Sequence, residues 1–433
     1  METFYIRTYG CQMNELDSEI LYTQLETRGL NLAKNENEAD LVIFNTCSIR
    51  ELSERKVLGK ILELKNKNKI IGVAGCMSMA KKDTLLKEYP HIKFILGTNN
   101  LLDINNILDD LLKDQKQINK TDEDYEKNLE NFFAKRVSKL KASISIIRGC
   151  NKKCSYCIVP LTRGKEVSRS KESVIKEANF LAKNGYKEIT LLGQNVNSYG
   201  RDFKDKKYLF SDLLYELNKV QGIERIRFMT SHPYDICEDL MYAIRDLDKV
   251  CEFVHFPIQS GSNKILKKMY RSYSREKYLD KVYKLKEIVP NVSIGTDIIT
   301  GFPGETDEDF EMTYQVFEEI QYDVAFIFAY SRRPNTPAWD LDDNVDQKIK
   351  IERVNILLDL YHKILREKYK KLIGTIQEVL VENTNSDINN LKGRTRRFEK
   401  VIFKGPDSLI GTLQHVKIES INHQTMIGSV LSN

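Results

Sequence analysis

Three cysteines, Cys150, Cys154 and Cys157, lie within the short segment RGCNKKCSYCIVP and have the spacing C-x-x-x-C-x-x-C. Cysteine thiolates bind soft metals, and a structural zinc site takes four ligands, usually as cysteine pairs or as cysteine with histidine. No second pair follows this segment, and the six histidines are scattered. A 4Fe–4S cluster is normally held by four thiolates. Three thiolates therefore indicate a cluster with one open iron, and zinc completed by the distant Cys237 or Cys251 is the alternative.

Three further cysteines each follow an apolar run that is typical of a buried strand. The runs are FYIRTYGC, ADLVIFNTC and KIIGVAGC, and they end at Cys11, Cys47 and Cys76. Segments with a helical pattern come next, at 14–28, 49–66 and 79–88. This βαβαβα order predicts a parallel sheet, whose strands end at one shared edge. We therefore expect Cys11, Cys47 and Cys76 to converge there, unless they are three unrelated buried thiols.

The chain as a whole has 433 residues, of which 41% are hydrophobic, and a net charge of +5. This length allows two or three domains, and the charge is too small to indicate a nucleic-acid partner by itself. The N-terminus lacks the pattern of a signal peptide, and no apolar run reaches the roughly 18 residues of a membrane span. We expect a cytoplasmic protein whose cysteines bind metal rather than form disulfides. Cys237 and Cys251 are expected to be small buried hydrophobic side chains.

The pattern of strands and helices predicts an α/β protein in three parts. An N-terminal parallel-sheet domain is expected at 1–115, and a charged, partly helical linker at 116–135. A partial (β/α)6 barrel at 136–366 would present its active face at the carboxyl ends of its strands. Short alternating runs at 369–433 predict a small all-β barrel. The six barrel strands are expected at 142–148, 187–193, 224–230, 252–258, 292–299 and 324–330.

Two helix ends in the barrel region carry recognisable signals. Thr306 and Asp309, in GETDEDF, have the spacing of a capping box that opens a helix. Asn184 and Gly185 follow an amphipathic segment and are typical of a helix C-terminus.

The cysteine loop after the first barrel strand resembles that of the radical S-adenosylmethionine (SAM) enzymes. In that family SAM chelates the open iron, and an electron from the cluster cleaves SAM to a 5′-deoxyadenosyl radical. Other segments are similar to the methylthiotransferases within it, and GRTRRFEKVIF at 393–403 is similar to their RNA-binding TRAM domain. Two positions depart from the pattern: Asn335, where glycine is expected, and Arg148, where an acidic residue is more common. The similar segments are TYGCQMN (8–14), NTCSIRE (45–51), GCM (75–77), GCNKKCSYCIVPLTRGKEVSR (149–169), LLGQNVNSYG (191–200), TSHP (230–233), HFPIQSGS (255–262) and TDIITGFPGET (296–306).

The resemblance implies two 4Fe–4S clusters, one on Cys150, Cys154 and Cys157 that coordinates SAM, and an auxiliary one on the other three cysteines, where the inserted sulfur would bind. It implies methylthio transfer to carbon 2 of N6-dimethylallyladenosine at position 37 of tRNA. That C–H bond is not acidic, which suits radical chemistry, and the sequence has no convincing acid–base constellation. The implied partners are the tRNA anticodon stem-loop and a flavodoxin-like or ferredoxin-like electron donor, and we expect a monomer.

Residues that follow the second to fifth barrel strands are candidates for binding SAM. As a group at one barrel face they favour ligand binding, although the glycines could serve tight turns alone. The candidates are Gly193, Gln194, Ser231, His232, Gln259, Ser260, Gly301 and Gly304.

A basic cluster near the C-terminus is the candidate RNA-binding face, with a solvated face or a structural lid as the alternatives. The candidates are Arg394, Arg396, Arg397 and Lys400, with Phe398 and Phe403 interleaved. Three other functions stay open: methylthiolation of threonylcarbamoyl-adenosine in tRNA, methylthiolation of a ribosomal-protein aspartate, and a non-enzymatic RNA-binding protein with structural clusters.

Overall fold

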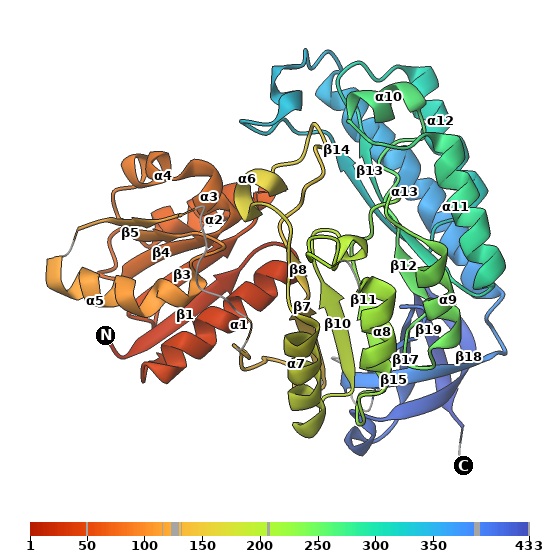
Figure 1. Cartoon of the computed structure of the whole chain (residues 1–433), viewed down its shortest axis with the longest axis horizontal. Coiled ribbons are helices and arrows are strands. Elements are labelled where there is room, and N and C mark those ends of the chain that lie inside the picture. Colours follow the sequence, from red (N-terminus) through yellow and green to blue (C-terminus); the bar gives the residue numbers. More distant parts are fainter. Residues whose placement is uncertain are drawn as a thin grey trace.

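The computed structural model describes residues 1–48, 51–114, 116–122, 130, 132–205, 208–384 and 390–431. Figure 1 shows three parts along the chain: an N-terminal α/β domain, a curved parallel sheet with helices on its outer side, and a small all-β barrel at the amino ends of that sheet. None of the described helices combines the length and apolar character that a membrane span requires. The expected α/β architecture is confirmed.

The N-terminal domain is built on a six-stranded parallel sheet in the order β2-β1-β3-β4-β5-β6. Its strands are β1 (Thr3–Thr8), β2 (Asn31–Leu32), β3 (Leu41–Thr46), β4 (Ile70–Gly75), β5 (Ile92–Leu96) and β6 (Ile118–Lys120). Its helices are α1 (Gln12–Thr27), α2 (Glu51–Glu63), α3 (Cys76–Lys81), α4 (Asp83–Glu88) and α5 (Ile104–Asp114).

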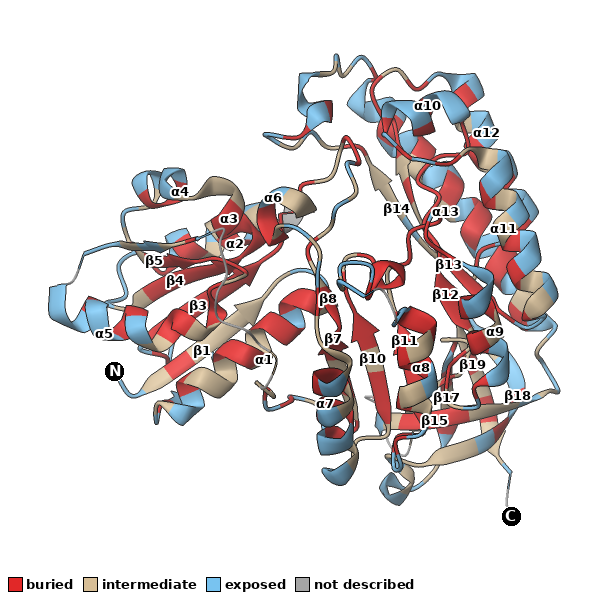
Figure 2. Ribbon diagram, in the orientation of Figure 1, coloured by how far each residue is buried: buried red, intermediate tan, exposed pale blue. Residues whose placement is uncertain are grey.

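Both faces of this sheet are covered by helices, which explains why β3 is buried at every position. Leu41 and Ile43 pack in one apolar core with residues of α1 and α5. Val42 and Phe44 point to the other face and pack with residues of α2 and α4. Figure 2 shows this buried layer between partly exposed helices. The sheet therefore fixes the ends of β1, β3 and β4, where the three cysteines follow.

The segment expected to be a linker is partly built into the N-terminal domain. Strand β6 pairs with β5, so the sheet extends beyond the boundary expected at 115. Ala134 packs in the same core as α1. Arg136 is buried and joins Glu19 of α1 to Glu177 of the barrel domain. The described part of this segment contains no α-helix, and residues 123–129 and 131 lie outside the described ones.

The central domain is an open barrel of six parallel strands. Strands β7, β10 and β11 form one three-stranded sheet and β12, β13 and β14 form another, and a parallel bridge between Ile226 and Val250 joins the two. The strands are β7 (Lys141–Ser145), β10 (Glu188–Leu192), β11 (Arg225–Phe228), β12 (Phe253–His255), β13 (Ser293–Thr300) and β14 (Val324–Ala329). The main covering helices are α7 (Lys171–Lys183), α8 (Phe210–Asn218), α9 (Glu238–Asp246), α11 (Arg275–Ile288), α12 (Asp307–Ile320) and α13 (Gln347–Lys370).

Both helix-end predictions in this domain are confirmed. Thr306 caps α12 and forms a capping box with Asp309. Helix α7 ends at Lys183 and is capped by Asn184, and Gly185 adopts a φ of 85°. Cys251 is buried as expected, whereas Cys237 is exposed because it lies at the surface end of α9.

The C-terminal domain is a closed five-stranded barrel in the order β15-β16-β17-β19-β18. It docks on the amino ends of the central strands, where Arg225 and Arg227 donate to backbone carbonyls of Arg394, Thr395 and Arg396. The strands are β15 (Ile376–Thr384), β16 (Asn390–Thr395), β17 (Lys400–Lys404), β18 (Leu413–Asn422) and β19 (Thr425–Val430).

Candidate active site

The loop with Cys150, Cys154 and Cys157 connects β8 (Ile147–Arg148) to the short helix α6 (Val159–Arg163), at the carboxyl end of the first barrel strand. The backbone itself closes the loop: the Cys150 N–H donates to the Gly164 carbonyl at 3.1 Å, and the Cys157 N–H donates to the Cys154 carbonyl at 3.1 Å. The three cysteines therefore lie on one folded loop.

Neighbouring loops hold this turn against the barrel. The Gln194 side chain accepts from the Gly149 N–H at 2.6 Å. Ser155 donates from its hydroxyl to the Lys268 carbonyl at 2.7 Å and from its backbone to Met269 at 3.0 Å. Gly149 has a φ of 73°, and a side chain there would clash with the Lys165 carbonyl, so this position requires glycine.

Burial and the neighbouring thiols raise the pKa values of the cysteines in this loop. Burial raises the pKa of Cys150 to about 11, and the nearby Cys154 thiol adds to the increase. Burial raises the pKa of Cys157 to about 12, with Cys154 and Cys150 adding to the effect. Thiols in such surroundings are inert alone, and a metal that binds them removes their protons outright. The loop is therefore suited to a metal centre rather than to a free nucleophile.

The other three cysteines also converge, at the ends of β1, β3 and β4. A side-chain carbon on Gly10 would lie 2.7 Å from Cys47 Cβ, so the chain before Cys11 passes directly over Cys47. Gly10 has a φ of 143°. Burial raises the pKa of the Cys76 thiol, and Cys11 raises it further. These contacts support the convergence expected from the strand ends.

Two buried asparagines hold these strand ends together. Asn14 donates to Asn45 Oδ1 at 3.1 Å, and Asn45 returns a hydrogen bond to the Asn14 carbonyl at 2.8 Å. The Cys11 thiol lies 3.3 Å from Asn14 Oδ1. Buried polar groups that are mutually satisfied fix one arrangement of the chain. The asparagine of TYGCQMN thus positions Cys11.

Helix α6 links the two cysteine sets physically. It begins two residues after Cys157 and packs against α3, whose first residue is Cys76 (Figure 1). Its last residue, Arg163, is buried and pairs with the fully buried Asp17 at 2.7 Å. The Thr98 hydroxyl donates to the Thr162 carbonyl at 2.6 Å. Neither Arg163 nor Asp17 was recognised from the sequence, because their partnership spans 146 positions.

Single-ion coordination does not explain these sites. Within the described ranges, no three Cys, His, Asp or Glu side chains are grouped so that they could hold one metal ion. A four-iron cube needs a wider arrangement, because each thiolate binds a different iron. Cys251 does not complete the Cys150 site as a zinc ligand, because it lies at the amino end of the barrel beside Arg227.

Of the SAM candidates, those after β10, β11 and β12 lie at the carboxyl ends of the strands as expected. Gly193 packs against Ile147, and Gln194 is committed to the cysteine loop. Gln259 adopts a φ of 73°, which is unusual for a residue with a side chain and frequent at functional sites. Ser260 is fully buried, 3.4 Å from the Thr313 hydroxyl.

Ser231 and His232 differ in what they can offer a ligand. The Ser231 hydroxyl is buried and has no hydrogen-bond partner among the described residues. Burial, and after it Arg271 and two lysines, lower the pKa of His232 to about 2, so its imidazole is neutral. Its Nδ1 accepts from the Tyr234 N–H at 3.2 Å. Ser231 is therefore the better hydrogen-bonding candidate.

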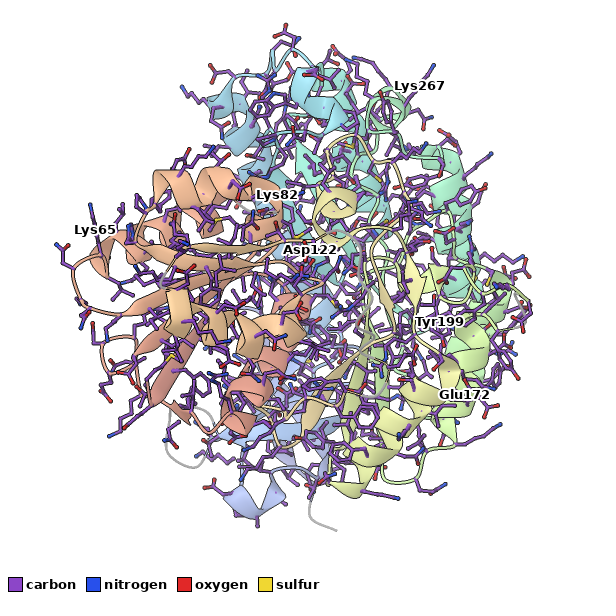
Figure 3. All side chains as sticks on the ribbon, turned by 60° about the vertical axis from the view of Figure 1, so that its left-hand side comes forward. Lys65, Lys82, Asp122, Glu172, Tyr199 and Lys267 are labelled. Atoms are coloured by element: carbon purple, nitrogen blue, oxygen red, sulfur yellow. The ribbon has the colours of Figure 1, made fainter. Side chains whose placement is uncertain are left out.

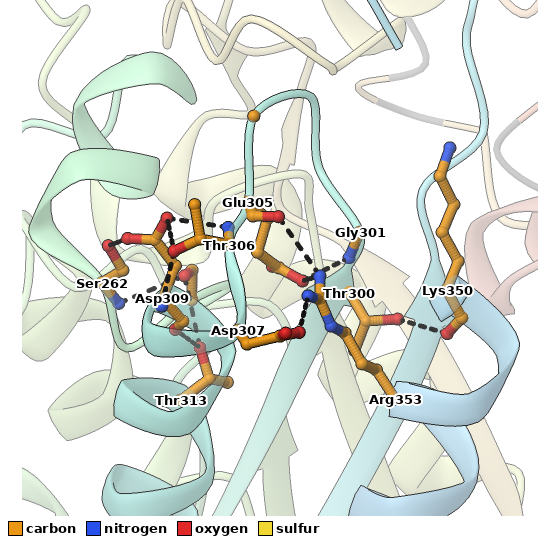
Figure 4. A network of polar contacts seen from close by, with 12 residues as sticks. Ser262, Thr300, Gly301, Glu305, Thr306, Asp307, Asp309, Thr313, Lys350 and Arg353 are labelled. Atoms are coloured by element: carbon orange, nitrogen blue, oxygen red, sulfur yellow. Dashed lines mark hydrogen bonds and ion pairs between the residues drawn. The ribbon is translucent and has the colours of Figure 1, made fainter. Parts of the chain in front are cut away.

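Gly301 and Gly304 belong to a loop that polar contacts tie down (Figure 4). The Gly301 N–H donates to Glu305 at 2.7 Å, and Arg353 of α13 pairs with the same carboxylate at 2.7 Å. Both glycines have positive φ angles, and a side chain at Gly301 would clash with Lys350. The conformation of this loop therefore requires glycine at both positions, whether or not they also contact a ligand.

The two departures from the family pattern have structural counterparts. Asn335 adopts a φ of 63°, the left-handed region that glycine and asparagine tolerate best. Arg148 Nη2 lies 4.0 Å from Asp17 Oδ1 at the auxiliary side of the site. Neither residue is one of the six cysteines expected to bind the clusters.

The three arginines of the basic cluster near the C-terminus are half-buried and have partners within the protein. Arg396 binds Glu252 through two nitrogens and donates to the carbonyls of Asp248 and Val250. Arg394 lies over the Phe398 ring at 4.3 Å, and Arg397 approaches Asp323 at 3.8 Å. The expectation that Arg396 meets phosphate is therefore corrected: its long-range partners, which the charge pattern did not reveal, make it a domain anchor.

The two aromatic side chains interleaved with this cluster also pack inside the protein. Phe398 stacks on Phe253 of β12 with ring centroids 5.0 Å apart, and Phe403 lies in the core of the small barrel. Lys400 is exposed at the surface of β17, so it stays a candidate for phosphate contact.

Replacing Arg396 by alanine is expected to loosen the docking of the C-terminal barrel. Charge-assisted hydrogen bonds contribute roughly 1.5–3 kcal/mol, so the free energy of unfolding should fall by about that amount. Urea denaturation and limited proteolysis near residue 370 would measure the effect. Lys400→Ala is the matched control and should leave stability unchanged. Arg396→Ala could instead keep its stability and lower the slope of log RNA affinity against log salt concentration by the amount expected for one phosphate contact. In that case Arg396 would contact RNA, and the anchoring role would be wrong.

A cavity of about 560 Å³ lies where the three domains meet. Its walls come from β1 and α1, from β7 and β10 of the open barrel, and from the C-terminal domain. The residues that line it include Thr8, Gln12, Ser143, Thr190, Arg394 and Phe398. The cavity thus connects the Cys11 end of β1 with the inner wall of the barrel.

Known proteins match each of the three parts. Residues 144–317 match the radical SAM superfamily, residues 3–97 match the uncharacterized protein family UPF0004, and residues 370–431 match the TRAM domain. Among solved structures, the radical SAM methyltransferase TsrM from Kitasatospora setae aligns with a TM-score of 0.56 and 14% identity, over 78% of this chain and 75% of that one. The radical SAM enzyme OxsB aligns with a TM-score of 0.52 and 12% identity, over 84% and 58%. At this identity the structures establish the fold alone.

Curated relatives are much closer in sequence. The tRNA-2-methylthio-N(6)-dimethylallyladenosine synthase of Protochlamydia amoebophila (strain UWE25) is 55% identical over 99% of this chain and 96% of that protein. The protein of the same name from Thermoanaerobacter pseudethanolicus is 48% identical over 94% and 88%. Both relatives are far more than 30% identical and match nearly the whole chain, so the chain belongs to the tRNA-2-methylthio-N6-dimethylallyladenosine synthase family of radical SAM methylthiotransferases.

Proposed function

We propose that this protein transfers a methylthio group to carbon 2 of N6-dimethylallyladenosine at position 37 of tRNA, beside the anticodon. One observation carries the proposal: helix α6 joins two three-cysteine sets, since it follows Cys157 and packs against α3, which begins at Cys76. Two incomplete thiolate sets on elements that touch suit two cooperating clusters better than two structural ones, which fill all their ligand positions. The names of the relatives supply the substrate.

The residues present fit the cofactors that the family uses, SAM and 4Fe–4S clusters. Cys150, Cys154 and Cys157 would hold the cluster that coordinates SAM, and the other three cysteines would hold the auxiliary one. Each set is a trio of thiols with a buried arginine beside it, Arg271 or Arg163. When bound, the first cluster supplies the electron that cleaves SAM to a 5′-deoxyadenosyl radical.

The protein's own residues hold and orient these groups. Gln194 and Ser155 fix the cysteine loop, Asn14 fixes Cys11, and the free hydroxyl of Ser231 is available to SAM. The cavity between the domains is the proposed receiver of a splayed-out loop base, which an anticodon loop can offer. All three predicted domains, 1–115, 136–366 and 369–433, contribute to it or border it.

The remaining partners are inferred from this chemistry. We place the enzyme in the cytoplasm, where its tRNA substrate is, and expect it to act as a monomer. A flavodoxin-like or ferredoxin-like protein would deliver the electron.

Mass spectrometry of tRNA from cells with and without this gene tests the proposal. The 2-methylthio nucleoside should be present only with the gene, and N6-dimethylallyladenosine should accumulate without it. Loss of a methylthio group from threonylcarbamoyl-adenosine instead, or from a ribosomal protein, would assign one of the alternative substrates. Unchanged tRNA and ribosomal proteins would support a non-enzymatic role.

A further inference from the structure

Arg271 is a buried cation that touches the SAM-side cysteine loop. Its Nη1 lies 3.3 Å from Cys154 Sγ, its Nε donates to the Tyr273 hydroxyl at 2.8 Å, and its Nη2 donates to the Pro257 carbonyl at 3.1 Å. The Tyr156 hydroxyl lies 3.5 Å from Nη1. The guanidinium is thus fixed from several sides and aimed at the thiol.

All of these partners are neutral groups or cysteine sulfur. Among the described residues, no carboxylate lies within ion-pair distance of Arg271. The other buried arginines of the site do have one: Arg163 pairs with Asp17 at 2.7 Å, and Arg353 pairs with Glu305 at 2.7 Å. Burying an unpaired charge costs several kcal/mol, so the position of Arg271 requires a negative partner.

The surface next to Arg271 does not supply that partner. A shallow hollow of about 360 Å³ is lined by Arg271 together with Lys267 and Lys277. Figure 3 shows Lys267 at the outer surface of the barrel domain, on α10 (Asn263–Lys268). Two lysines add positive charge, so the counter-charge must come from the cysteine side.

We propose that Arg271 is the counter-charge of the cluster on Cys150, Cys154 and Cys157, and that it raises the reduction potential of that cluster. The inference rests on the proposed function. Three thiolates give the cluster a net negative charge, and reduction adds one more electron. A fixed cation at low dielectric stabilises the more negative, reduced form more strongly. A hydrogen bond to a ligand sulfur also tunes the potential. Arg271 is therefore a positioning and tuning residue that acts through Cys154.

Redox titration of the cluster, followed by its electron paramagnetic resonance signal, tests this role. The auxiliary site is removed by replacing Cys11, Cys47 and Cys76 with alanine, and SAM is left out so that SAM binding cannot affect the result. In Arg271→Met the ratio of reduced to oxidised cluster at a fixed potential should fall at least tenfold, which equals 59 mV for one electron. Arg271→Lys, which keeps the charge, should restore most of the ratio.

Lys267→Met is the matched control, because it removes an exposed charge from the same hollow, and its ratio should change less than about twofold since solvent screens it. An unchanged ratio in Arg271→Met at normal iron content would overturn the proposal, as would equal losses in the Met and Lys variants. If Arg271→Met does not take up iron, Arg271→Gln is titrated in its place under the same criterion. A parent protein without a cluster on these cysteines would refute the proposed function instead.

Discussion

Replacing Cys150, Cys154 and Cys157 together by alanine is expected to abolish cleavage of SAM completely. Bound iron should fall from about eight to about four atoms per chain, since each cube contains four irons. The three thiols lie on one loop closed by backbone hydrogen bonds, so the substitutions remove the ligands but not the bonds that close the loop. Anaerobic reconstitution, an iron assay and detection of 5′-deoxyadenosine measure both effects.

The two remaining cysteines provide matched controls for this variant. Cys251 is as buried as Cys154 but lies at the other end of the barrel, and Cys237 is exposed. Alanine at either position should leave eight irons and normal cleavage. Any 5′-deoxyadenosine from the triple variant would mean that SAM is cleaved elsewhere and that these cysteines do not hold its cluster.

The positions of the cysteines in the fold could be predicted from the sequence because strand ends are local features. An apolar run followed by Gly10-Cys11 or Gly75-Cys76 indicates where a strand ends, and parallel strands end at a shared edge of the sheet. The sheet then brings together residues far apart in the chain without any need to know their partners. The same logic placed the SAM candidates on the carboxyl face of the barrel.

The groups around the cysteines could not be predicted in this way. Arg163 meets Asp17 across 146 positions and Arg271 meets Cys154 across 117, and no period or spacing in the sequence encodes such pairs. The partners of Arg396, in the basic cluster, could not be predicted either. Arginines close together in sequence suggested an open cationic face, whereas Arg396 finds Glu252 across 144 positions and becomes an anchor. Charge patterns reveal where charges are but not what neutralises them.

The edges of the N-terminal domain were missed for a different reason. Strand β6 has only three residues, Ile118–Lys120, and sits within a strongly charged stretch. An edge strand needs few apolar side chains because one side of it faces solvent. Its pairing with β5 is therefore visible only in three dimensions.

Replacing Cys11, Cys47 and Cys76 by alanine is expected to eliminate the methylthiolated nucleoside while leaving cleavage of SAM measurable. Iron should again fall from about eight to about four per chain. The two functions separate because the loop of Cys150 is held by its own contacts with Gln194, Gly164 and Lys268, none of which belongs to the N-terminal domain.

The contact between α6 and α3 makes this test demanding, because the two sites are physically joined. Arg163→Lys serves as the control for indirect damage: it keeps a cation next to Asp17 but loses the planar geometry of the pair. It should retain both clusters and reduced but detectable product. Liquid chromatography with mass spectrometry of digested tRNA gives the product, and 5′-deoxyadenosine in the same reaction gives the cleavage. If the triple cysteine variant still formed the methylthio nucleoside, the auxiliary cluster would not deliver the sulfur. If it also lost cleavage of SAM, the two sites would not function independently, and the contact between α6 and α3 would do more than position the two cysteine sets.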